Sequence, residues 1–155
     1  MKNERVHRWL TLGANFGVLI GIALLLVELN QNATMIRAQT RNELSTGIVD
    51  LFGIVAENQQ LASLRRRADA GDELTEDEAY QYAIITRAFF RYWENVHYQY
   101  RQDLYDDVEF ARQREAWKSY AATSEALVRF WCEHGEEFSP EFASEFDSVL
   151  TTHTC

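Results

Sequence analysis

Glu94 and His97 come closest to a chemical motif in this 155-residue chain, since a Glu-x-x-His spacing puts a carboxylate and an imidazole on one side of a helix. Helical bundles that bind two iron ions use this pattern, but they need two such pairs and two further inward glutamates. The sequence does not complete that set. We therefore expect no cofactor and a polar pair in or near a core; a metal-dependent enzyme at these two residues is the second alternative.

Aromatic residues surround this pair in the stretch AFFRYWENVHYQYRQ. Rings at helical spacing are typical of a buried core, which is the interpretation that we prefer. The alternative is an apolar ligand pocket, which would make the protein a membrane-tethered small-ligand sensor or binding domain. The residues of that candidate pocket are Phe89, Trp93, His97 and Tyr100.

Other chemistry finds little support in the sequence. It has no Gly-x-Ser-x-Gly elbow and no glycine-rich phosphate loop, so we expect no catalysis. The net charge is −9, and because Lys2, Arg5 and Arg8 precede the first apolar run with only Glu4 against them, the rest carries −11. An acidic domain repels phosphate backbones, which argues against nucleic-acid binding. Apolar residues make up 46% of the chain, enough to predict a folded core.

The stretch from Leu10 to Val27 reads LTLGANFGVLIGIALLLV and contains no charge. As a helix it would be about 27 Å long, close to the roughly 30 Å of a bilayer's hydrocarbon core. A cleaved signal peptide is the rival interpretation, but the following VELNQNA lacks small residues at the cleavage positions. We therefore expect an uncleaved anchor. Its N-terminus is expected to be cytoplasmic, because three Lys or Arg residues precede the segment and only Arg37 and Arg41 follow it closely.

Three glycines at four-residue spacing lie in this segment, at Gly13, Gly17 and Gly21. Small residues at this spacing let two membrane helices approach closely. At 100° per residue, Glu28 falls within about 20° of both Gly17 and Gly21 on the helical wheel. Glu28 either reaches into water at the membrane edge or hydrogen-bonds across a helix pair, with help from Asn30 or Asn32. We take this face as the candidate association surface.

A single proline and the lack of strand signals predict an all-α fold. The domains expected are a basic tail over 1–9, a transmembrane helix over 10–28, an acidic helical domain over 29–150 and a tail over 151–155. The spanning helix should continue toward Arg67, past a weak point at ELNQN. Further helices are expected over 75–104, 107–121 and 124–134, and from Ser139 and Pro140 onward. A capping box at Thr75 and Glu78 should begin the first of these, and Gly135 should end the third.

The segments VELNQNA, RAFFRYWENVHYQYRQDLYDD and FSPEF resemble a group of uncharacterised small bacterial single-pass membrane-anchored helical proteins. The resemblance covers roughly residues 10–150. It implies a bacterial source and an address in the inner (plasma) membrane, and it brings no activity or catalytic residue.

From these patterns we expect a single-pass membrane protein in contact with lipid that acts as a homo-oligomeric scaffold or interaction module. Cys132 and Cys155 form neither a disulfide framework nor a metal-ligand spacing, so cysteine usage leaves the compartment open.

Overall fold

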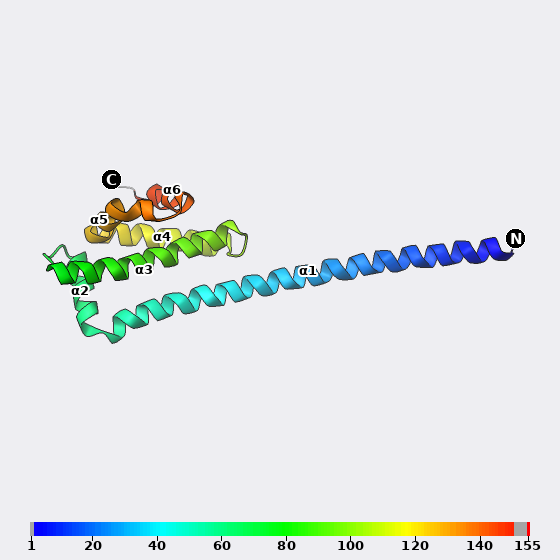
Figure 1. Ribbon diagram of the computed structural model, residues 1–155, viewed down its shortest axis with the longest axis horizontal. Helices are drawn as coiled ribbons and strands as arrows, with labels where there is room; N and C mark the ends of the chain where they lie inside the picture. The colour runs from blue at the N-terminus through cyan, green and yellow to red at the C-terminus, as the bar shows by residue number, and fades with distance from the viewer. Residues whose placement is uncertain (1, 151–154) are drawn as a thin grey trace. The chain divides into compact units, whose positions relative to one another are not determined.

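A computed structural model describes residues 2–150 and 155, without the side chains of residues 2 and 4–6, and every element in this part of the chain is helical (Figure 1). The chain divides into an N-terminal unit that ends at Gln39 and a second unit, here called the bundle, over Thr40–Cys155. Apart from Cys155, the expected tail over 151–155 lies outside the described residues. The elements are α1 (Lys2–Glu57), α2 (Gln59–Asp69), α3 (Glu76–Arg101), α4 (Asp107–Thr123), α5 (Glu125–His134), the 3-10 turn η1 (Gly135–Glu137) and α6 (Pro140–Val149).

The N-terminal unit consists of the first two thirds of α1. It contains a segment long and apolar enough to cross a membrane, with a mean hydropathy of 2.3, and none of that segment is buried. The helix passes through ELNQN without a break. The prediction that it continues toward Arg67 is wrong, because α1 ends at Glu57. Asn58 adopts an extended backbone conformation, and its side chain accepts the Leu61 N–H and so caps the start of α2.

Local capping signals set where the bundle helices begin. Thr75 and Glu78 form the predicted capping box at the start of α3, and Asp106 and Ser124 cap α4 and α5. Pro140 occupies the first turn of α6, where its missing N–H costs nothing. Between α2 and α3 the chain turns at Gly71, whose φ of +84° is open to glycine and strained for other residues.

Gly135 ends α5, but not as a left-handed cap. Its φ is −56°, and the chain continues into η1. A Cβ atom at this position would lie 3.2 Å from the Trp131 ring, a tighter contact than most Cβ atoms make. Glycine is therefore favoured here by a close approach between the backbone and the indole.

The core of the bundle is built mainly from aromatic rings. Phe90 is fully buried, and its ring centroid lies 5.0 Å from that of Phe146 and 5.1 Å from those of Trp93 and Trp131. The end of α1 contributes to the same unit through Leu44, which is 5% exposed. The side chains with essentially no exposed surface are Trp117, Phe90, Phe142, Phe146 and Val96. Each buried ring removes a large apolar area from water, so this core supplies most of the driving force for folding the bundle.

Candidate functional site

The glycine face of α1 is open over its whole length. A Cβ atom built on Gly13, Gly17 or Gly21 would meet no heavy atom within 4 Å, and Glu28 is exposed on the same helix. The large apolar side chains between Trp9 and Leu29 are exposed as well, each by half or more. Such a surface is unfavourable in water and suits either lipid or another apolar helix.

The four residues of the candidate ligand pocket lie against other rings. Trp93 is 3% exposed and packs on Trp117, while the Tyr100 ring stacks on Phe110 with centroids 3.9 Å apart. Phe89 contacts the Phe52 ring at the end of α1 and lies under the Arg65 guanidinium. Aromatic side chains therefore fill the space around Trp93, as a packed core requires.

His97 lies in the same core, 5% exposed, with its ring between those of Phe110 and Phe142 at centroid distances of 5.9 and 6.0 Å. Burial lowers its pKa, because the charged imidazolium loses hydration. The negative charge of Glu145 opposes this effect, and Arg101 adds to it. His97 is thus held toward its neutral form.

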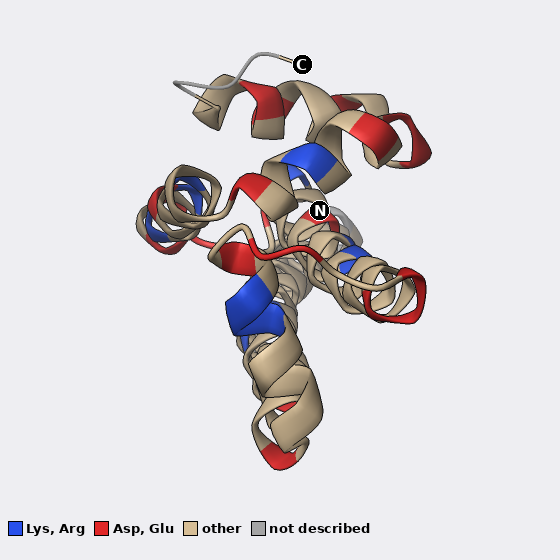
Figure 2. Cartoon of the chain, turned by 90° about the vertical axis from the view of Figure 1, so that its left-hand side faces the viewer, with Lys and Arg blue, Asp and Glu red and all other residues tan. Residues whose placement is uncertain are grey.

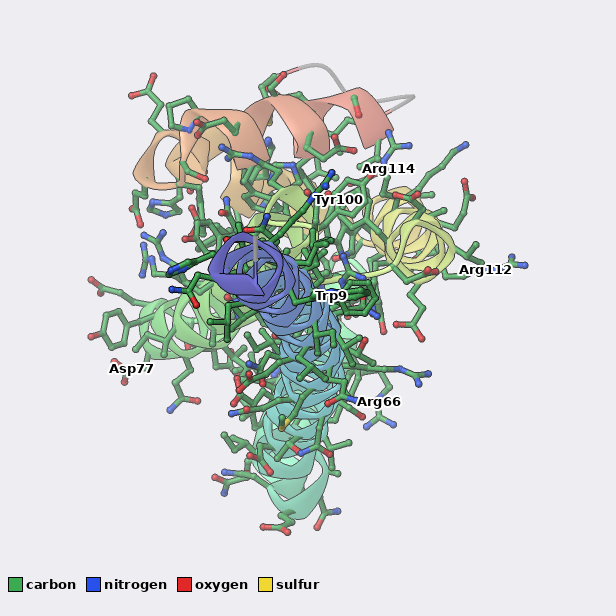
Figure 3. All side chains as sticks on the ribbon, turned by 90° about the vertical axis from the view of Figure 1, so that its right-hand side faces the viewer. Trp9, Arg66, Asp77, Tyr100, Arg112 and Arg114 are labelled. Atoms are coloured by element: carbon green, nitrogen blue, oxygen red, sulfur yellow. A yellow bond between two sulfur atoms is a disulfide. The ribbon has the colours of Figure 1, made fainter. Side chains whose placement is uncertain are left out.

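The carboxylates near His97 are paired with arginines. Glu145 on α6 forms an ion pair with Arg114 of α4, and Glu141 lies 3.3 Å from the guanidinium of Arg101. Figure 3 shows Arg114 reaching toward α6, whereas Arg112, on the same helix, points away from the bundle. A divalent cation at His97 would have to compete with these two guanidinium groups for its ligands.

Glu94, the partner proposed for His97, bonds to other groups. One oxygen accepts the Ser139 backbone N–H at 2.7 Å, and the other accepts an N–H from Arg91 at 2.7 Å. Burial raises the pKa of Glu94, but the Ser139 and Arg91 hydrogen bonds outweigh it, so that the net shift is downward. Glu94 therefore ties α3 to the start of α6 as a charged carboxylate.

Within the described residues, no group of three or more His, Cys, Asp or Glu side chains could hold a metal ion. The sequence contains a second Glu-x-x-His pair at Glu4 and His7, which sequence reasoning missed. That pair lies in the N-terminal unit, not in the bundle. The residues around His97 hold a neutral imidazole in the core. The carboxylates nearby form ion pairs with arginines, and Glu94 also accepts a backbone N–H at the start of α6.

A disulfide joins Cys132, at the end of α5, to Cys155. Their Cα atoms are 5.3 Å apart, a usual distance for this bond. The sequence had left both cysteines unassigned. An even cysteine count was the only signal for the bond, and pairing requires the fold to bring the two residues together.

Acidic residues lie on the bundle helices and on the turns between them, as Figure 2 shows in red. The basic run at the end of α2 serves local contacts: Arg67 pairs with Glu78 at 2.6 Å, and Arg65 lies 3.8 Å from Asp69. Arg66, labelled in Figure 3, is exposed. Arg67 therefore ties α2 to the start of α3 across the turn, whereas the Arg65 pair lies within α2.

No protein-family model, curated protein or solved structure matches this chain.

Proposed function

We propose that this protein is a single-pass membrane-anchored scaffold that self-associates through α1 and does not catalyse a reaction. The observation that carries the proposal is the open glycine face of Gly13, Gly17 and Gly21, where an added Cβ atom would meet no heavy atom within 4 Å. Lipid gives helices no hydrophobic drive to associate, so close backbone approach at small residues is the principal source of affinity between them. Glu28 lies on this face and would add a hydrogen bond at its end.

Two observations support an uncleaved anchor with the bundle on the oxidising side of the membrane. First, α1 runs on from the apolar segment to Leu44, a residue of the bundle core, so cleavage after the segment would cut through a continuous helix. Second, the Cys132–Cys155 disulfide is of a kind that persists in the periplasm and is rare in the cytosol. The basic residues before the segment favour the same orientation.

The packed aromatic core supports a scaffold over a ligand sensor. Trp93, His97 and Phe89 are each at least 95% buried, and their neighbours are side chains of the bundle itself. The paired state of Glu94, Glu141 and Glu145 likewise favours a structural role for the charges near His97. A bundle whose core and nearby carboxylates are engaged by its own side chains suits a protein whose task is to present a surface.

Self-association of the full chain tests the proposal. Donor- and acceptor-labelled chains are mixed in lipid vesicles, and energy transfer is measured as the lipid-to-protein ratio is raised. Gly17→Ile should abolish transfer at ratios where the wild-type chain still shows it, because the side chain keeps the two backbones apart. Ala23→Ile is the matched control, since position 23 lies roughly 120° or more from Gly17 and Gly21 on the wheel. Equal transfer from wild type and Gly17→Ile would refute association through the glycine face.

A further inference from the structure

A groove runs over the surface between α5 and α6, where η1 joins them. Its volume is about 460 Å³, within the range of about 300–1,000 Å³ usual for ligand clefts. Trp131, Phe138 and Ala143 line it, and the two cysteines of the disulfide form part of its wall. We call it the α5–α6 groove. The other notable apolar pocket, about 290 Å³ beside Ile54 and Ile84, has uncharged lining residues and gives no indication of its occupant.

The charged residues that line the α5–α6 groove are both acidic, Glu136 and Asp147. Asp147 accepts the Trp131 indole N–H through Oδ1 at 2.8 Å, which fixes the carboxylate at the groove. The other two carboxylates of α6, Glu141 and Glu145, are neutralised by arginines, but within the described residues no Lys or Arg lines this groove. The groove thus combines an apolar floor with uncompensated negative charge.

We propose that the α5–α6 groove binds a basic segment of a partner protein, in which a Lys or Arg stands beside an apolar residue. The cation pairs with Asp147 and Glu136, and the apolar neighbour packs on Phe138 and Ala143. Charge complementarity carries this choice, since an acidic segment would meet two like charges at the groove. This role does not depend on self-association, because the groove is formed entirely by residues of one bundle.

The test uses the full chain, labelled with ¹⁵N at tryptophan, in nanodiscs of zwitterionic lipid so that cationic probes do not adsorb to the bilayer. The chain has four tryptophans, and Trp131→Phe assigns the indole signal of Trp131. The probe is acetyl-Leu-Lys-Leu-amide, and acetyl-Leu-Glu-Leu-amide is its matched control. We expect the lysine peptide to shift the Trp131 signal with saturation and the glutamate peptide to leave it unchanged.

Two variants separate charge from shape. Asp147→Asn keeps an acceptor for the Trp131 indole but removes the charge, and it should weaken lysine-peptide binding by about tenfold, the size expected for a hydrogen bond to a charged group. Ala143→Leu should block binding, because the larger side chain would occupy the space in the groove that the peptide needs. The controls are Glu133→Gln and Ser144→Leu, exposed neighbours that do not line the groove. The proposal is overturned if both peptides bind alike, if neither binds, or if Asp147→Asn binds as tightly as wild type.

Discussion

The two units of this chain use the same kinds of side chain in opposite ways. Trp9 and Phe16 in the N-terminal unit are 73% and 66% exposed, whereas Trp117 and Phe90 in the bundle have no exposed surface. The apolar segment of the N-terminal unit lies well inside the continuous helix α1, where backbone hydrogen bonds within the helix satisfy the peptide groups, as a bilayer would require. The bundle instead depends on packing its rings away from water. The contrast separates a helix that is long and apolar enough to span a membrane from a bundle that buries its rings in a core of its own.

The largest effect that separates the units should come from deleting one ring in each. Phe90→Ala leaves a cavity among at least four other rings and should lower the free energy of unfolding of the bundle by about 3–5 kcal/mol. Phe16→Ala removes an exposed ring from the N-terminal unit and should leave that value unchanged. Urea unfolding of the full chain, followed by tryptophan fluorescence, measures both. Similar losses from the two variants would contradict the division into an exposed N-terminal helix and a packed bundle.

Removal of the disulfide should have the next largest effect, and in the bundle alone. The bond spans 23 positions. Closing a loop of this size lowers the conformational entropy of the unfolded chain, which stabilises the folded bundle by about 3 kcal/mol. The double variant Cys132→Ser, Cys155→Ser should lose that amount against oxidised wild type in urea unfolding. With excess reductant the two proteins should unfold alike. A difference that persists in reductant would mean that the substitutions act through contacts other than the bond.

A smaller, pH-dependent effect should come from His97. Because its pKa is lowered in the folded bundle, the unfolded chain binds the proton more readily, and stability falls as pH drops from neutrality through about 6.5 toward the folded pKa. His97→Gln should remove part of this loss between pH 7.5 and pH 5, measured by urea unfolding. His7→Gln, in the exposed N-terminal unit, is the control. An identical pH dependence in wild type and His97→Gln would show that His97 is not responsible.

The helices were predictable wherever short-range signals decide the outcome. Residues close in sequence determine the capping box at Thr75, the helix caps at Asp106 and Ser124, and the apolar run of α1. The all-α fold follows from such signals. The end of α1 was missed because a single residue, Asn58, stops the helix by an extended backbone and a side-chain cap. Helical periodicity continues across that point and hides the break.

The candidate sites were less predictable, because they depend on contacts between distant segments. Glu94 bonds to Ser139, which lies 45 positions away, and the sequence offered His97 as its nearer partner. The disulfide and the α5–α6 groove likewise arise only once α6 has folded back on α5. The glycine face could be located from spacing alone, since it lies on a single helix.

The disulfide also has a consequence for the lifetime of the protein. It closes a covalent ring that contains η1 and α6, and α6 supplies Phe142 and Phe146 to the core. A protease that cuts the exposed turn near Glu136 would therefore open the ring without releasing α6, and the fragment would stay at its binding site at high effective concentration. A nicked bundle can thus keep its shape, and its loss requires reduction of the bond or a second cut.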